Sequence, residues 1–271
     1  MPPVKGRQNP ETYPLLDIST LVEVQQPFTI LSDGRKRKRA SAFCVDVLSD
    51  AFEGGQERCF LKIFLPDAAN TACFKAECEA NHALHQYASE NTKVLTGKQP
   101  LEVFKTHLQL SNGKHRLSWP LCYGYISVED PFFHPPVKKR QNGPEQPVPQ
   151  LHGLLFQHYE DLTLVSPDDI DGGGVMQAKI LAALAPIHAA RILHRDLEER
   201  TVWPEAGFRN IFLKDGEPVI LDFDHSQMIQ ERDEKRLQEE ETQMKELMAK
   251  AVENRGREKG WGLSKEVLRL L

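Results

Sequence analysis

The sequence has no run of about 18 consecutive apolar residues, so we expect no membrane-spanning helix. It contains only five cysteines, and this odd number without a CxxC pair argues against a disulfide framework and against zinc sites of common spacing. No P-loop motif, HExxH motif or internal repeat occurs. The first residues lack the apolar core of a signal peptide, so we expect a cytoplasmic or nuclear protein.

A strong excess of one charge is also missing. The net charge of −5 over 271 residues gives no electrostatic reason to expect a nucleic-acid partner. Hydrophobic residues make up 40% of the chain, which is enough for one large domain or two small lobes. Residues 1–15 are polar and proline-rich, and we expect a disordered N-terminus that spans residues 1–19. Residues 229–271 are strongly charged and predict a helical tail with a thin apolar seam.

Three polar side chains stand at the ends of apolar runs within the segment 189–226. Asp196 and Asp222 each follow such a run, and Asn210 precedes another. The Asp-Gly pair at 215–216 predicts a tight hairpin between two strands. Two carboxylates and an amide are oxygen ligands that suit Mg²⁺, which is usually shared with phosphates. The alternative is that each of the three side chains only forms a turn at a strand end.

Three short motifs resemble those of the protein-kinase-like superfamily: HRDL at 194–197, RN at 209–210 and LDF at 221–223. The resemblance implies that Asp196 is the base that orients the acceptor hydroxyl. It also implies that Asn210 and Asp222 are metal ligands for Mg²⁺. For His194 we expect a place in the core, bonded to backbone carbonyls, with a chemical role as the alternative.

The chain departs from the family pattern in three places. Thr201 stands where the family has its asparagine, so we expect an insertion before Asn210. Asp224 replaces the glycine of the DFG motif, which predicts a less mobile segment. In place of a glycine-rich loop the chain has Gly34 followed by the basic run 35–39. That run is a phosphate contact, a nuclear-localisation patch or a solvated turn.

A lysine lies inside the apolar strand predicted at 58–65. Burying a lone ammonium group is costly, so Lys62 must reach solvent or pair with an acid. It resembles the phosphate-contacting lysine of the family's third strand. The following segment, 67–88, has helical spacing, and its FKAECEANHAL run places Glu77 at the family's ion-pair position. Glu79 is the alternative partner, and both glutamates being solvated is the other possibility.

The segment 151–164 predicts a buried strand followed by a turn. By resemblance this is the fifth strand and the hinge, where the backbone binds the adenine of ATP. Phe156 would close the back of that nucleotide site. Gln157, His158 and Tyr159 would line the hinge.

The predicted fold is α+β, with a bilobal protein-kinase-like domain at 20–228. Its β-rich N-lobe spans about 20–160, and its abbreviated helical C-lobe spans about 161–228. Without an APE-like segment or a peptide platform, the chain resembles short orphan kinase-like proteins of fungi. The resemblance implies an ATP- and Mg²⁺-dependent phosphotransferase, a kinase acting on a hydroxyl of a protein or small-molecule acceptor. The alternative is a weak or inactive pseudokinase that binds proteins through the 131–150 loop and the 229–271 tail.

Overall fold

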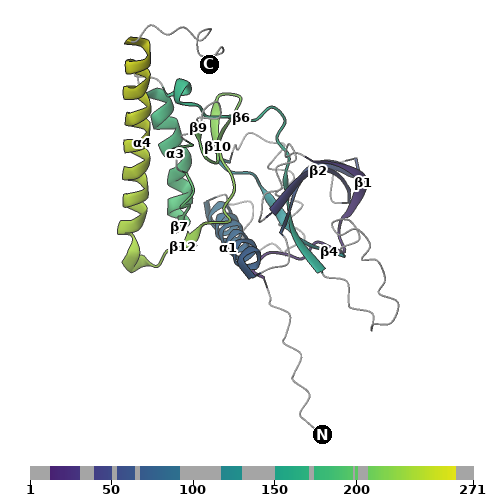
Figure 1. Cartoon of the computed structure of the whole chain (residues 1–271). Helices are drawn as coiled ribbons and strands as arrows, with labels where there is room; N and C mark the ends of the chain where they lie inside the picture. Colours follow the sequence, from purple (N-terminus) through teal and green to yellow (C-terminus); the bar gives the residue numbers. More distant parts are fainter. Residues whose placement is uncertain are drawn as a thin grey trace, which may run out of the picture.

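The computed structural model describes residues 13–30, 40–50, 54–64, 68–91, 117–129, 150–170, 174–197, 199–200 and 207–260. Their architecture is mixed α+β, with a five-stranded curled antiparallel sheet and three α-helices. In Figure 1 the sheet lies on one side, and α3 (Val175–Ala189) and α4 (Lys235–Gly260) lie on the other. Helix α1 (Ala68–Asn91) stands between them. No helix in these ranges is both long and apolar enough to cross a membrane.

The large sheet has five strands: β1 (Glu23–Ile30), β2 (Ala40–Leu48), β3 (Gln56–Phe64), β4 (Cys122–Glu129) and β5 (Gln150–Gln157). Their order is β1-β2-β3-β5-β4, and all neighbouring strands are antiparallel. Side chains alternate along β3, so Leu61 and Ile63 enter a core on one face of the sheet. Lys62 and Phe64 therefore point to the opposite face, which α1 covers.

Helix α1 presents an apolar stripe to that face of the sheet. Phe74 and Cys78 are buried along it in a cluster with residues of the sheet, and the Phe74 ring meets Phe64 edge-on with centroids 5.3 Å apart. Glu77 is three residues after Phe74 and so lies on the same side of the helix. The packing of α1 on β3 therefore carries Glu77 toward the strand that holds the lysine.

The second half of the chain contributes shorter strands: β6 (Thr163–Leu164), β7 (Ile192–Leu193), β8 (Glu199–Arg200), β9 (Gly207–Phe208), β10 (Ile211–Lys214), β11 (Glu217–Ile220) and β12 (Gln227–Met228). Strands β6, β10 and β11 form a three-stranded antiparallel sheet, while β7 pairs with β12 and β8 with β9. The predicted hairpin is confirmed, because Asp215 and Gly216 turn the chain between β10 and β11 with φ of 52° and 78°.

The charged segment predicted at 229–271 contains α4, which packs in the main core. A short 3-10 helix, η2 (Glu231–Asp233), leads into it, and a second one, η1 (Pro167–Asp169), lies against it. Met244 and Met248 pack in the same cluster as Ile180 from α3. The apolar seam was correctly identified, and a domain boundary at 228 would cut through this core.

The predicted disorder of residues 1–19 is wrong for residues 13–19. Ile18 is fully buried, and its N–H donates to the Tyr125 carbonyl at 3.0 Å. The Tyr125 N–H in turn donates to the Leu16 carbonyl at 3.0 Å. Gly124 permits this approach, because a Cβ there would lie 2.5 Å from the Leu16 oxygen and its φ is 150°. The segment is thus docked on β4 by main-chain contacts.

Several predicted features lie outside the described residues: residues 1–12, Gly34 with the basic run 35–39, the proline-rich segment 131–149, Thr201, and residues 261–271.

Candidate functional site

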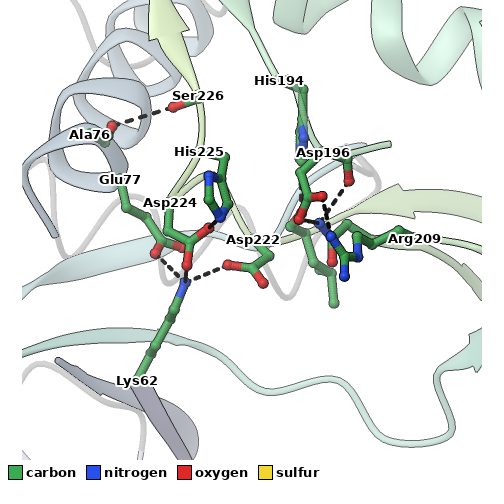
Figure 2. Close-up of polar contacts among 12 residues, drawn as sticks. Lys62, Ala76, Glu77, His194, Asp196, Arg209, Asp222, Asp224, His225 and Ser226 are labelled. Carbon is green, nitrogen blue, oxygen red and sulfur yellow. Dashed lines mark hydrogen bonds and ion pairs between the residues drawn. The ribbon is translucent and has the colours of Figure 1, made fainter. Parts of the chain in front are cut away.

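A buried ion cluster surrounds Lys62 of β3. Its Nζ atom lies 2.5 Å from Glu77 Oε2, 2.5 Å from Asp222 Oδ1 and 3.4 Å from Asp224 Oδ2, as Figure 2 shows. Only 8% of the lysine side chain is exposed. The predicted ion pair between Lys62 and Glu77 is therefore present. Glu79, the alternative partner, is half-buried on α1 and is not part of this cluster.

The carboxylates in the cluster outnumber the cation. Burial alone would lower the pKa of Lys62, but Asp222, Glu77 and Asp224 together raise it well above its usual range. Burial raises the pKa of Glu77 to about 7, against the opposing effect of Lys62. Burial also raises the pKa of Asp224. The Lys62 ammonium therefore stays charged, whereas burial makes the charged forms of Glu77 and Asp224 less favourable than they are in water.

The backbone around Asp222 is fixed from two sides. The Leu221 N–H donates to the Asn210 carbonyl at 2.9 Å. His194 Nε2 donates to the Leu221 carbonyl at 2.9 Å, and its ring packs against Phe223 with centroids 4.9 Å apart. Burial lowers the pKa of His194, so the ring is neutral in the core, as expected. Asp222 itself has a φ of 67°, a left-handed conformation that aspartate tolerates better than most residues.

A second polar cluster adjoins the first and centres on Asp196. Arg209 Nη1 donates to Asp196 Oδ1 at 2.6 Å. Asn210 Nδ2 donates to the Asp196 carbonyl oxygen at 2.9 Å and to Asp196 Oδ2 at 3.1 Å. Because the amide nitrogen faces Asp196, the Asn210 Oδ1 atom is left as the acceptor that could meet a cation. Figure 2 shows the Asp222 carboxylate between this cluster and Lys62.

These oxygens do not form a metal cage by themselves. In the part of the chain that the structure describes, no three His, Cys, Asp or Glu side chains form a metal-binding group. Asp222 and Asn210 would supply one oxygen ligand each. Mg²⁺ typically takes one or two protein ligands and fills its octahedron with water and phosphate oxygens. The donor set therefore fits Mg²⁺ that arrives with a phosphate ligand.

Glu240 of α4 is the residue of this region that the sequence prediction missed. Its carboxylate accepts hydrogen bonds from the backbone N–H groups of His194 (3.1 Å) and Arg195 (2.6 Å) and from His188 Nε2 (2.8 Å). Burial by itself would raise the pKa of Glu240, but these hydrogen bonds bring it below its usual value. The helix thereby fixes the backbone that leads into Asp196. A signal existed, since Glu240 interrupts the apolar face that Leu237 begins.

The four residues predicted to line a nucleotide site lie where β5 leaves the large sheet. Phe156 is buried beside Phe60, with ring centroids 6.0 Å apart, and Phe60 alternates with Lys62 on the same face of β3. Gln157 ends β5, and its N–H donates to a backbone carbonyl in the segment before β4 at 2.8 Å. His158 and Tyr159 are half-buried and begin the connection to β6.

No family model matches this chain, and no curated protein is similar to it by sequence comparison.

Proposed function

We propose that this chain is an ATP- and Mg²⁺-dependent phosphotransferase with a protein-kinase-like fold, acting on a hydroxyl group. One observation carries the proposal: Lys62 of β3, Glu77 of α1 and Asp222, which follows β11, meet in one buried ion cluster. That cluster adjoins the hydrogen-bonded pair of Asp196 and Asn210. The five residues are those that the motifs single out, and their contacts suit a phosphate site.

In this proposal the large sheet with α1 is the N-lobe. The C-lobe contains the short strands, α3 and also α4, which extends it beyond residue 228. The connection at 158–162 is the hinge, where the backbone near His158 and Tyr159 would meet adenine. Phe156 would close the inner end of that site.

The proposed chemistry is positioning and charge neutralisation. Lys62, oriented by Glu77, would contact the α- and β-phosphates once it is released from Asp222. Asp222 and Asn210 would hold Mg²⁺ against the phosphate oxygens. Asp196 would orient the acceptor hydroxyl. Preorganised charges of this kind supply a large part of the rate enhancement in phosphoryl transfer.

A thermal-shift titration with ATP, with and without Mg²⁺, tests the proposal. Ligand at 100 times its dissociation constant stabilises a protein by about 2.7 kcal/mol, which is roughly 5–10 °C for a domain of this size. We expect a Mg²⁺-dependent shift in the wild type that Asp222→Asn abolishes. Asparagine tolerates the left-handed backbone at this position, so the variant removes charge without a conformational penalty.

Asp215→Asn is the matched control. It makes the same chemical change at another left-handed position, on the exposed hairpin between β10 and β11. Asp215→Asn should keep the full ATP shift. If the wild type melts cooperatively and shows no shift at millimolar ATP with Mg²⁺, nucleotide binding is excluded and the proposal fails.

The second candidate function is a pseudokinase that binds nucleotide or a partner protein without phosphoryl transfer. The ion pair between Arg209 and Asp196 favours it, because the acceptor-orienting carboxylate is already engaged by a cation. A Mg²⁺-dependent ATP shift without any ADP formation would support this candidate. ADP formation that is lost in Asp196→Asn but retained in Asp215→Asn would reject it.

A further inference from the structure

Asp224 is the member of the lysine cluster that the proposed phosphotransferase does not require. Only 10% of its side chain is exposed, and its Oδ2 atom lies 3.4 Å from Lys62 Nζ. Its Oδ1 atom is buried and has no hydrogen-bond partner within the described ranges. The Nε2 atom of His225 lies 3.7 Å from Oδ1, beyond hydrogen-bond distance. A buried carboxylate oxygen in this state is costly to maintain.

Three carboxylates face the ammonium of Lys62 when Asp224 is in place. Lys62 Nζ donates hydrogen bonds to Glu77 and Asp222, and Asp224 Oδ2 lies 3.4 Å from the same nitrogen. An ammonium group has three N–H donors, so Asp224 competes with an incoming phosphate oxygen for the remaining one. An approaching polyphosphate would also meet three negative charges around a single positive one, which opposes its entry.

The three carboxylates differ in what an incoming ligand can do to them. Glu77 is held on α1 at 2.5 Å from the ammonium. Asp222 can turn to a divalent cation, as the donor set around Asn210 suggests. Asp224 has the longest contact with Lys62, at 3.4 Å against 2.5 Å for the other two. Asp224 is therefore the partner of Lys62 that phosphate must displace directly.

We propose that Asp224 is a competing counter-ion that closes the phosphate site, so that Lys62 accepts a nucleoside polyphosphate only when a divalent cation accompanies it. The inference rests on the proposed function and adds a control residue to the same site. In the unliganded protein Asp224 occupies the place of a phosphate oxygen. A cation bound at Asp222 offsets the negative charge of the cluster and of the phosphates, which lets the polyphosphate replace Asp224 at the ammonium.

Calorimetric titration with inorganic tripolyphosphate and with ATP, each in EDTA and in Mg²⁺, tests this inference on the full chain. Asp224→Asn removes the charge with little change in shape. We expect it to bind tripolyphosphate in EDTA at least tenfold more tightly than the wild type, with a smaller difference at saturating Mg²⁺. Asp224→Glu, which keeps the charge, should bind as weakly in EDTA as the wild type. Equal or weaker binding by Asp224→Asn in EDTA would overturn the inference.

A second measurement needs no nucleotide. The rate at which an anionic acylating reagent modifies Lys62, mapped by peptide mass spectrometry, reports how available the amine is to an anion. Asp224→Asn should increase this rate severalfold over the wild type and Asp224→Glu. Equal rates would overturn the inference. Faster modification in a protein that binds no ATP under any condition would instead overturn the proposed function and leave the counter-ion role standing.

Discussion

Two buried polar clusters, one around Lys62 and one around Glu240, have opposite compositions. At Lys62, one ammonium group faces three carboxylates. At Glu240, one carboxylate accepts hydrogen bonds from three donors, two of them backbone N–H groups. The first cluster has an excess of acceptors, and the second has one acceptor group that is matched by three donors.

The pKa shifts show what this difference means for stability. Folding lowers the pKa of Glu240, so the fold favours its charged form. Folding raises the pKa of Glu77 to about 7 and raises that of Asp224, so the fold disfavours their charged forms. The Glu240 cluster therefore stabilises the fold at neutral pH. The Lys62 cluster keeps repelling charges together, and perturbed groups of this kind are concentrated at functional sites.

The largest expected effect is at Lys62. In Lys62→Met the three carboxylates lose their only cation, and breaking a buried ion pair in this way costs about 3–5 kcal/mol of the free energy of unfolding. Chemical denaturation at neutral pH measures the loss. Lys179→Met is the control, because Lys179 pairs with Glu217 at the surface and should contribute less than about 1 kcal/mol. Equal losses in the two variants would show that the buried Lys62 cluster contributes no more to the free energy of unfolding than a surface ion pair does.

The next effect is at Glu240. Glu240→Gln replaces a carboxylate by an amide that cannot accept from all three donors, so we expect the free energy of unfolding to fall by about 2–3 kcal/mol. The neighbouring Glu239 is 53% exposed, and Glu239→Gln should change stability by less than about 0.5 kcal/mol. A loss at Glu240 no greater than at Glu239 would mean that the hydrogen bonds to the backbone before Asp196 do not hold that loop.

Both regions were partly predictable from the sequence. A lysine within an apolar strand has to find an acid, and the three-residue spacing from Phe74 to Glu77 places that acid on the packed face of α1. The contact of Asp224 with Lys62 was not predictable from the sequence. The chain reaches Asp224 through the left-handed backbone of Asp222, and the hydrogen bonds that hold the preceding Leu221 come from His194 and Asn210.

Glu240 and the docked N-terminal segment at 13–19 show a different limit of prediction from the sequence. Glu240 lies in a run of three glutamates, and only the later position of Met244 places it on the buried side of α4. Leu15 and Ile18 lie in a short segment with no strand or helix periodicity, so the sequence gives no sign that it packs. Their burial depends on the approach to Gly124, which is a tertiary contact without a local signal.

The two clusters should also respond to pH in opposite directions. Glu240 has a folded-state pKa below its unfolded value, so its stabilising contribution is present above about pH 4.5 and is lost as the pH falls. Glu77 has a folded-state pKa of about 7, so its destabilising contribution appears as the pH rises from about 4.5 through 7. Denaturation at several pH values should show the wild type gaining stability over Glu77→Gln between pH 8 and pH 5. Relative to Glu240→Gln, it should lose stability below about pH 4.5. Parallel pH profiles for the three proteins would contradict the comparison.

The smallest expected effect has the opposite sign. Asp224→Asn removes one of three crowded carboxylates while Lys62 keeps Glu77 and Asp222, and a buried amide costs less than a buried carboxylate. We therefore expect the variant to be more stable than the wild type by about 1 kcal/mol at neutral pH. The gain should shrink on acidification, because the wild-type Asp224, whose pKa is raised, then takes up a proton in the folded state. Denaturation at pH 7.5 and pH 5 measures both effects. An Asp224→Asn variant that is less stable than the wild type at pH 7.5 would show that the Asp224 carboxylate stabilises the fold. The position of Asp224 would then be explained by stability alone.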